Sequence, residues 1–542
     1  MEAPIQHKAV PRSLLGGFSD LSLAYKVIAI TVLAGLLHAV AFKSKTTKRF
    51  PVFATLEIPL AGFLRSRGGL GQRIYSAIRR KNGSVFGLTS GHQILVNFSG
   101  ADRFMSQGHQ TINAEPLQYT ILTRVFGCPN TLEFEARVEA DTKDLTAPVE
   151  RLFMNDSLVT AALERSRVTE RGASFVSLSD RPEDMKRWER SANIRLVSPG
   201  VVEANLQSLS RDFGACVAMP LLYGHDFMDR YPRVLDDFWT FDNDMFPLLM
   251  VGIPAWAPFK MMRDARAARA RLHEQIAGLY KRIEQHQKGE PVDFGADMSD
   301  VSHAALVRSS IYTKNNWPHK LRGQCDLAVL WGQNANTQPM LFWVLVYVYS
   351  TPGLVDQLRE ELKFCVTISH TSTHPEITSI DFSILSRQCP RMKACLFETY
   401  RLANDPASIR YVEKPIQVKD GEYQHELKPG TWVSVPHAIA QRDPSVYADP
   451  DTFVPERFLE VDPESGKLTA KYGRLRPWGV GPASCKGRNF AEKELLSLAA
   501  VVLSLWDIDP ASGTWQLPAQ VPGTGVKKPV EDVRVVISRR VF

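Results

Sequence analysis

The chain has 542 residues, of which 44% are hydrophobic and 23% charged, and its formal net charge is +7. These proportions are those of a large globular protein, and they exclude a disordered chain and a polytopic membrane protein. So small a positive charge on so long a chain gives no indication of nucleic-acid binding. At about 150 residues a domain, the length alone predicts three or four domains.

The first feature along the chain is an apolar run, Leu21–Phe42, in which Lys26 is the one charged residue. A helix of this length would reach about 33 Å, enough for a bilayer core of about 30 Å. The positive-inside rule places the downstream chain in the cytosol, because basic residues follow the run: Lys43, Lys45, Lys48 and Arg49. The sequence therefore predicts one transmembrane helix within an anchor and linker over residues 1–50. The alternative is a buried core helix.

After the anchor, the hydrophobic pattern predicts a mainly α-helical protein with a small β portion. The predicted elements are a hairpin over 84–98, a helix over 262–287, a loop region over 288–320, a long apolar helix over Leu321–Tyr349, a helix over Leu354–Phe364 and a strand over Thr431–Val435. No Pro/Gly-rich linker divides these elements. We therefore expect one large unit over 51–542, in contrast to the number that the length suggests.

The seven cysteines are scattered without a C-x-x-C pair, which argues against a disulfide framework or a structural zinc site. Cys485 stands in a Gly-rich segment, RPWGVGPASCKG over 476–487. Its glycines, Gly479, Gly481 and Gly487, allow a tight turn and close approach to a planar group. The turn amides and the helix that follows would stabilise a thiolate. Cys485 is thus a candidate ligand or nucleophile, although this segment alone fits a buried inert cysteine equally well.

Two further motifs precede this loop. Glu398 and Arg401 have i, i+3 spacing within the predicted helix MKACLFETYRLA, which puts a carboxylate and a guanidinium on one helix face. Taken alone, such a pair is usually a surface pair of little energetic worth. The segment FVPERF over 453–458 contains Arg457. Each motif is weak singly, but their order and spacing ahead of the cysteine loop form a specific pattern.

This pattern resembles that of the cytochrome P450 family over nearly the whole chain after the anchor. The family's haem-binding pattern, F-x-x-G-x-[RH]-x-C-x-G, corresponds to WGVGPASCKG over 478–487. The resemblance implies the cytochrome P450 fold and a haem cofactor whose iron takes the Cys485 thiolate as its axial ligand. It further implies that Trp478 and the three loop glycines bind haem, that Arg410 contacts a haem propionate, and that Glu398, Arg401 and Arg457 form a buried charge triad.

Several positions depart from the family's pattern. Trp478 replaces the usual Phe and keeps an aromatic ring beside the ligand, whereas Ala483 replaces the usual Arg or His and removes one expected propionate contact. In the oxygen-binding helix, the pattern [AG]-G-x-[DE]-T-T is replaced by GQNANTQP over 332–339. Ala335 takes the place of the acid and Asn336 that of the threonine in the pair that delivers protons during oxygen activation.

The Ala335–Asn336 substitution resembles the branch that contains sterol 7α- and 12α-hydroxylases and prostacyclin synthase. That branch includes oxygenases and one non-redox isomerase, so the substitution does not decide the reaction type. An alignment shifted by one residue would instead return Thr337 to the key position. Asn336 either donates a hydrogen bond or holds a water for proton relay, or it simply fills a helix kink ahead of Pro339.

The resemblance implies a membrane-anchored haem-thiolate monooxygenase of the endoplasmic reticulum, with its catalytic domain in the cytosol. It would oxidise an apolar small molecule with O₂ and electrons from an NADPH-cytochrome P450 reductase. Basic residues close to Cys485 in sequence would attract that acidic partner: Lys471, Arg474, Arg476, Lys486 and Arg488. The motifs look like those of fungal secondary-metabolism members. The alternatives are a haem-thiolate isomerase or dehydratase that needs no reductase, and a non-catalytic haem-binding member.

Overall fold

The computed structural model describes residues 48, 50–51, 85–89, 91–95, 100–293, 298–369, 375–420 and 422–541. The predicted transmembrane helix over 21–42 lies outside these residues. Among the residues that the structure does describe, no helix combines the length and apolar character that a membrane crossing requires.

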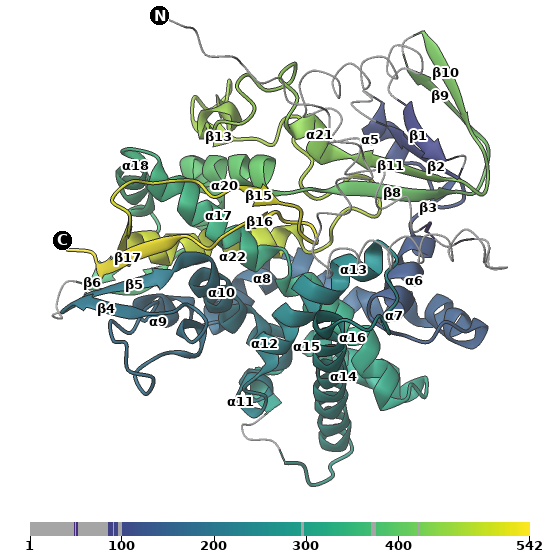
Figure 1. Cartoon of the computed structure of the whole chain (residues 1–542), viewed down its shortest axis with the longest axis horizontal. Coiled ribbons are helices and arrows are strands. Elements are labelled where there is room, and N and C mark those ends of the chain that lie inside the picture. The colour runs from purple at the N-terminus through teal and green to yellow at the C-terminus, as the bar shows by residue number, and fades with distance from the viewer. Residues whose placement is uncertain are drawn as a thin grey trace, which may run out of the picture.

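Helices make up most of the described chain, as predicted (Figure 1). The α-helices are α5 (Ala101–Met105), α6 (Glu115–Arg124), α7 (Leu132–Met154), α8 (Asp156–Arg165), α9 (Val168–Ala173), α10 (Leu206–Tyr223), α11 (His225–Arg230), α12 (Val234–Thr240), α13 (Phe246–Met250), α14 (Lys260–Gln287), α15 (His303–Lys314), α16 (His319–Asn334), α17 (Thr337–Ser350), α18 (Leu354–Leu362), α19 (Phe382–Gln388), α20 (Pro390–Ala403), α21 (His437–Gln441) and α22 (Arg488–Leu505). Shorter turns are the 3₁₀ segments η1 (Arg187–Glu189), η3 (Met298–Asp300) and η4 (Pro455–Phe458), and the π-helical turn η2 (Phe241–Met245).

The β portion consists of small sheets at the edges of the helical body. One sheet has the order β1-β2-β11-β8-β3, built from β1 (Val85–Thr89), β2 (His92–Leu95), β11 (Trp432–Pro436), β8 (Ala407–Val412) and β3 (Ile112–Asn113). Another has the order β14-β17-β5-β4, built from β14 (Trp506–Pro510), β17 (Arg534–Arg539), β5 (Val201–Asn205) and β4 (Arg195–Ser198). The two-stranded pairs are β6 (Val366–Ser369) with β7 (Glu376–Ile380), β9 (Ile416–Asp420) with β10 (Tyr423–Leu427), β12 (Leu459–Val461) with β13 (Leu468–Ala470), and β15 (Gln520–Val521) with β16 (Lys528–Pro529).

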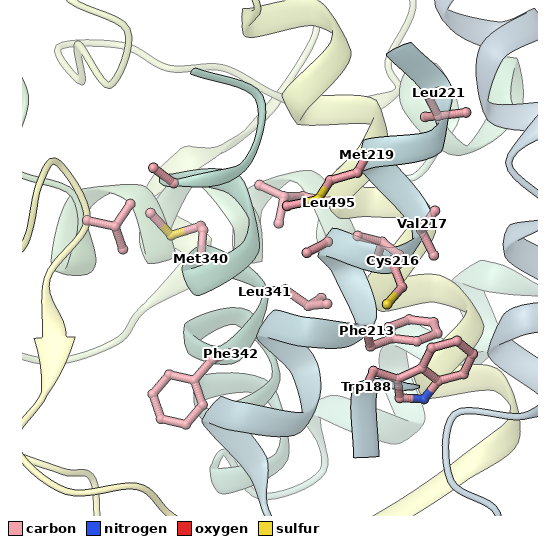
Figure 2. Close-up of a cluster of buried hydrophobic side chains, with 14 of the residues drawn as sticks. Trp188, Phe213, Cys216, Val217, Met219, Leu221, Met340, Leu341, Phe342 and Leu495 are labelled. Carbon is pink, nitrogen blue, oxygen red and sulfur yellow. The ribbon is translucent and has the colours of Figure 1, made fainter. Parts of the chain in front are cut away.

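The main core is a continuous set of buried apolar side chains that runs from Val125 to Ile537. Figure 2 shows its centre, where Phe213 and Met219 of α10, Met340 of α17 and Leu495 of α22 lie together. The helices α10, α17 and α22 carry buried residues on nearly every face, as expected for helices enclosed by other helices. Burying so much apolar surface is the main term that stabilises a fold of this size.

Long helices pack closely where small residues permit it. The pattern of 262–287 predicted one helix, and α14 confirms it, with buried residues at Met262, Ala265, Leu272 and Ile276 on one face. α14 runs beside α16, and the crossing is close because a Cβ at Gly323 would clash with the His273 carbonyl oxygen. The hairpin prediction is also confirmed, by the antiparallel pair β1–β2.

Two sequence predictions need correction. The polar stretch 288–320 is not a continuous loop, because it contains α15, whose first turn is capped by the Ser302 hydroxyl accepting from the Ala305 N–H at 3.1 Å. The single long helix over Leu321–Tyr349 is instead divided into α16 and α17. The physical reason is Pro339, which has no N–H to donate to the Ala335 carbonyl four residues earlier.

Candidate functional site

The loop that carries Cys485 is held mainly by backbone contacts. Gly481 has a φ of +75°, and a Cβ at this position would clash with the carbonyl oxygen of Met105 at the end of α5. The Val480 N–H donates to the Ser408 hydroxyl at 3.2 Å, and the Cys485 N–H donates to the Trp478 carbonyl at 2.9 Å. The loop is therefore positioned by α5 on one side and by β8 on the other, and glycine is required where it approaches α5.

The Cys485 residue is exposed, and α22 begins three residues later at Arg488. The Gly487 N–H and the Arg488 charge both lower the pKa of the Cys485 thiol, as the turn and helix start predicted. Desolvation by the surrounding protein is the larger effect, however, so the pKa is raised overall. The two stabilising contributions expected from the turn and the helix start are present, but they do not outweigh desolvation. A cation at the sulfur is what would favour the thiolate form.

Trp478 is tied to a hydrogen-bonded chain that leads away from the loop. Its indole N–H donates to the Tyr472 hydroxyl at 3.2 Å, and that hydroxyl donates to Glu492 at 2.7 Å. Lys393 forms an ion pair with Glu492 at 3.0 Å, and Tyr400 packs edge-on against the Trp478 ring with centroids 5.1 Å apart. A phenylalanine at 478 would lack the indole donor, so the departure from the family's usual residue adds a contact that fixes the ring.

The three residues of the predicted triad meet in the core. Arg401 and Glu398, both 0% exposed, form a bidentate pair at 2.6 and 2.7 Å, and the Arg457 Nε lies 3.4 Å from Glu398. The remaining Arg401 donors reach backbone carbonyls at 2.6 to 3.1 Å: those of Gln441, Pro450 and Thr452. This ion pair is therefore buried and fully hydrogen-bonded, not the weak surface pair that the spacing alone allowed.

Arg410 on β8 is buried, with 6% exposure. Its guanidinium donates to the carbonyls of Ile409 and Val480, both at 2.9 Å. Burial lowers the pKa of Arg410, and no carboxylate within the described ranges forms an ion pair with it. A buried guanidinium without a counter-charge is costly, so this position fits an anionic group supplied by a ligand. Arg410 thus stands beside the cysteine loop as a haem propionate contact would require.

The segment between α16 and α17 holds the second group of candidate residues. Ala335 and Asn336 lie at the helix interruption, and Thr337 begins α17 and is buried. The Asn336 Oδ1 atom is buried and accepts no hydrogen bond in the described part of the chain. It is close to Gly525, where an added Cβ would clash with it. The structure therefore places Asn336 at the interruption with a carbonyl oxygen available, whereas Thr337 is within the next helix.

A neighbouring buried pair has no counterpart in the motifs identified from sequence. The Gln338 amide on α17 donates to the Glu494 carboxyl on α22 at 3.1 Å, and both residues are 0% exposed. Burial raises the pKa of Glu494 to about 8, and the Gln338 hydrogen bond lowers it only in part. Ser408, Tyr472 and Glu494 were all missed, because isolated polar residues in apolar or turn-rich segments carry no periodic signal.

The predicted basic face is partly neutralised. Lys471 forms an ion pair with Glu460, and Arg476 forms one with Asp102 at 2.7 Å. Arg488 donates to the Cys485 carbonyl at 3.1 Å. Within the described segments, three basic residues of this group form no ion pair: Arg474, Lys486 and Arg488.

Comparison with known proteins identifies the class to which this fold and site belong. A model of the family described as cytochrome P450 matches residues 222–532, which is more than half of the chain. The chain therefore belongs to the cytochrome P450 family, and the predicted resemblance is confirmed.

Curated relatives are distant. The chain is 26% identical over 299 residues to the cytochrome P450 monooxygenase poxD of Penicillium oxalicum, an alignment that covers 55% of this chain and 57% of the relative. It is 24% identical over 444 residues to the cytochrome P450 monooxygenase efuG of Hormonema carpetanum, covering 76% and 75%. It is 27% identical over 284 residues to the 25-hydroxycholesterol 7-alpha-hydroxylase of Rattus norvegicus, covering 51% and 63%. The predicted branch of sterol hydroxylases is thus represented among the relatives.

Haem bound through a cysteine thiolate is the family's cofactor, and the residues present fit it. The Cys485 residue is exposed, the loop glycines leave no side chain in the way, and Arg410 is a buried cation without an acidic partner in the described part of the chain. Among the described residues there is no cluster of three or more His, Cys, Asp or Glu that could hold a metal ion unaided. A single thiolate ligand is what a porphyrin-bound iron requires from the protein.

Proposed function

We propose that this chain is a haem-thiolate monooxygenase that oxidises an apolar small molecule with O₂ and electrons from an NADPH-cytochrome P450 reductase. The observation that carries the proposal is the exposed Cys485 in its loop beside the buried Arg410, which forms no ion pair with any described residue. Bound haem would supply the oxygen-activating chemistry, with the Cys485 thiolate as axial ligand. Trp478, Gly479, Gly481 and Gly487 would shape the loop around it.

Asn336 and Thr337 are proposed to act in proton transfer during oxygen activation. Ala335 stands where the family usually has an acid, and its methyl side chain cannot carry a proton. The Asn336 amide lies at the helix interruption with its Oδ1 without a donor in the described chain, so it can hold a water by accepting one hydrogen bond while its NH₂ donates another. The Thr337 hydroxyl, one residue on, is a second group able to pass a proton.

The predicted anchor and the relatives support a proposal for the protein's cellular setting. We propose that residues 1–50 hold the protein in the endoplasmic reticulum membrane and that residues 51–542 form the catalytic domain in the cytosol. An apolar substrate would then partition into the same membrane. Relatives named as monooxygenases in Penicillium oxalicum and Hormonema carpetanum support a role in fungal secondary-metabolite biosynthesis. Arg474 and Lys486 are proposed as basic contacts for the reductase.

A second candidate function is motivated by the Ala335–Asn336 pair. An enzyme that rearranges or dehydrates a substrate already carrying an O–O bond needs neither a reductase nor delivered protons. The absence of an acid at 335 suits such a reaction. The same haem and the same Cys485 ligand would serve it, so only the requirement for electrons and O₂ distinguishes the two.

The haem assignment is tested with purified full-length protein. Reduced protein under CO should show the Soret band that is specific to thiolate-ligated haem, and Cys485→Ser should abolish it. Cys325→Ser, which changes a half-buried cysteine on α16, is the matched control and should keep the band. An unchanged band in Cys485→Ser would show that another residue binds the iron.

The reaction is tested by incubating the holoprotein and reductase with a metabolite extract from the source organism. The proposal predicts consumption of NADPH and O₂ and a product that contains one added oxygen atom from ¹⁸O₂. Product formed without NADPH and O₂ would establish the isomerase or dehydratase function instead. A protein that shows the thiolate-type band yet gives no product under either condition would support the non-catalytic alternative.

A further inference from the structure

A second cation-capable side chain is buried beside Arg410. His437 begins α21, directly after β11, and is 6% exposed. β11 pairs with β8, which carries both Ser408 and Arg410. Burial is the main cause that lowers the pKa of His437 to about 4, and the charges of Arg476 and Arg410 lower it further. Ser408, which contacts the His437 ring, and Arg410 both bind Val480 of the cysteine loop, so His437 and Arg410 lie beside the same part of this loop. The strands β8 and β11 therefore place a buried guanidinium and a buried, neutral imidazole that can gain a proton next to the cysteine loop.

Ser408 fixes the orientation of the His437 ring. The Ser408 hydroxyl oxygen accepts from the Val480 N–H at 3.2 Å and lies 2.9 Å from the His437 Nε2. Because its oxygen already accepts from the loop, the hydroxyl proton is free to donate to Nε2. In that tautomer the His437 Nδ1 carries the proton, and Nδ1 has no hydrogen-bond partner in the described part of the chain. With the ring in this tautomer, His437 offers one N–H donor that no described residue accepts.

The anionic side chain that influences this group is already neutralised. Asp102 is the one carboxylate that acts on the pKa of His437, and it forms an ion pair with Arg476 at 2.7 Å. Arg410 and His437 therefore face no uncompensated negative charge in the described structure. The buried Arg410 charge costs free energy unless a ligand supplies a negative charge. Such an anion would also raise the pKa of His437 and favour its protonated form.

At position 483 the chain lacks the family's usual contact to a haem propionate, so another donor is needed nearby. The family's pattern has an Arg or His two residues before the cysteine, and this chain has a methyl group there. We propose that His437, oriented by Ser408, replaces that missing residue and binds a haem propionate together with Arg410. The inference rests on haem binding through Cys485, but not on which reaction the haem supports.

The test measures haem loss from the holoprotein to an excess of apomyoglobin. His437→Gln keeps a side chain that can still hydrogen-bond to Ser408 but cannot become cationic. We expect it to lose haem about 10-fold faster than the wild type, as removal of a charge-assisted hydrogen bond implies. His92→Gln is the matched control, because His92 is a buried histidine in the same sheet that pairs with the Ser434 hydroxyl at 2.7 Å. It should leave the rate unchanged.

Two further measurements separate propionate binding from a merely structural role. Adding Ala483→Arg to His437→Gln restores the family's usual contact and should bring haem loss back to within about 3-fold of the wild type. Protein reconstituted with haem dimethyl ester, which lacks the carboxylates, should lose it at the same rate with and without His437→Gln. A variant effect that persists with the ester, or that Ala483→Arg does not repair, would overturn the proposal. All variants should keep the thiolate-type CO band. If the wild type itself lacked this band, the result would count against Cys485 as the ligand and not against the role of His437.

Discussion

The cysteine loop and the helix interruption at Asn336 are built in different ways. The loop is held mainly through its own backbone atoms: Gly481 lies against the Met105 carbonyl, the Cys485 N–H donates to the Trp478 carbonyl, and the Val480 N–H donates to the Ser408 hydroxyl. The interruption is bordered by side chains and by one distant glycine, with the Asn336 Oδ1 against Gly525. Backbone contacts hold Cys485, the proposed iron ligand, in place and tolerate little change, whereas side-chain contacts can differ from one chain to another. We therefore expect changes near the loop to cost stability and changes at the interruption to alter function.

The largest loss of stability is expected when the buried charge triad of Glu398, Arg401 and Arg457 is broken. Glu398→Ala strands the Arg401 guanidinium in the core, and breaking a buried pair in this way costs about 3–5 kcal/mol. We expect little folded holoprotein, measured as haem content per milligram and by the CO spectrum. The control is Glu460→Ala, which removes the exposed partner of Lys471 and should cost about 0–1 kcal/mol. Equal holoprotein yields for the two variants would contradict the structural role of the triad.

The next effect isolates the close backbone approach of the loop. Gly481→Ala places a residue with a side chain at positive φ, which costs about 1–2 kcal/mol, and drives a Cβ into a backbone carbonyl, which adds about 1–3 kcal/mol. Gly473→Ala is the control, because Gly473 has a φ of +52° but open space around its Cβ. The melting temperature should therefore fall more for Gly481→Ala, and its CO spectrum should lose part of the thiolate-type band. Similar shifts in both variants would show that the contact with Met105 does not constrain the loop.

The hydrogen-bonded pair Gln338–Glu494 should make the stability of the fold depend on pH. The pKa of Glu494 is raised from 4.5 to about 8 in the folded protein, so the folded state binds a proton that the unfolded state releases between these values. Stability is therefore highest below about pH 4.5 as far as this group is concerned, and it falls by about 1.4 kcal/mol per pH unit until about pH 8.

Glu494→Gln removes this titration while keeping the shape and one hydrogen bond. The variant and the wild type should melt at similar temperatures near pH 5, and the variant should melt at a higher temperature near pH 8. Parallel curves of melting temperature against pH would mean that Glu494 does not keep its proton in the folded protein.

Motifs with fixed geometry could be predicted from sequence, but contacts between distant segments could not. The spacing of Glu398 and Arg401 defines one helix face, and the Gly-rich run around Cys485 defines a tight turn, so the structure places these residues as local rules require. By contrast, nothing local links His437 to Ser408 or Asn336 to Gly525. These pairs depend on strand pairing and on a loop from the C-terminal part of the chain, and an alignment of motifs does not encode either. Even the interruption at Ala335 was predicted as a continuous helix, although Pro339 removes the hydrogen bond that continuity requires.

Changes at the interruption between α16 and α17 should affect stability least but should alter function. Gly525→Ala pushes a methyl group onto the Asn336 Oδ1, and the amide can turn away because it is the end of a flexible side chain. Both Gly525→Ala and Asn336→Ala should therefore alter stability by less than about 1 kcal/mol. If Asn336 positions a proton-relay water, each variant should lower the product formed per NADPH consumed, with the substrate found by the extract experiment.

The double variant should be no worse than Asn336→Ala, because both changes act on the same Asn336 amide. Gly108→Ala, whose Cβ would meet open space, is the control and should have no effect. An additive loss in the double variant would show that Gly525 acts on another group, and an unchanged product yield in Asn336→Ala would leave the amide with no role beyond filling the kink.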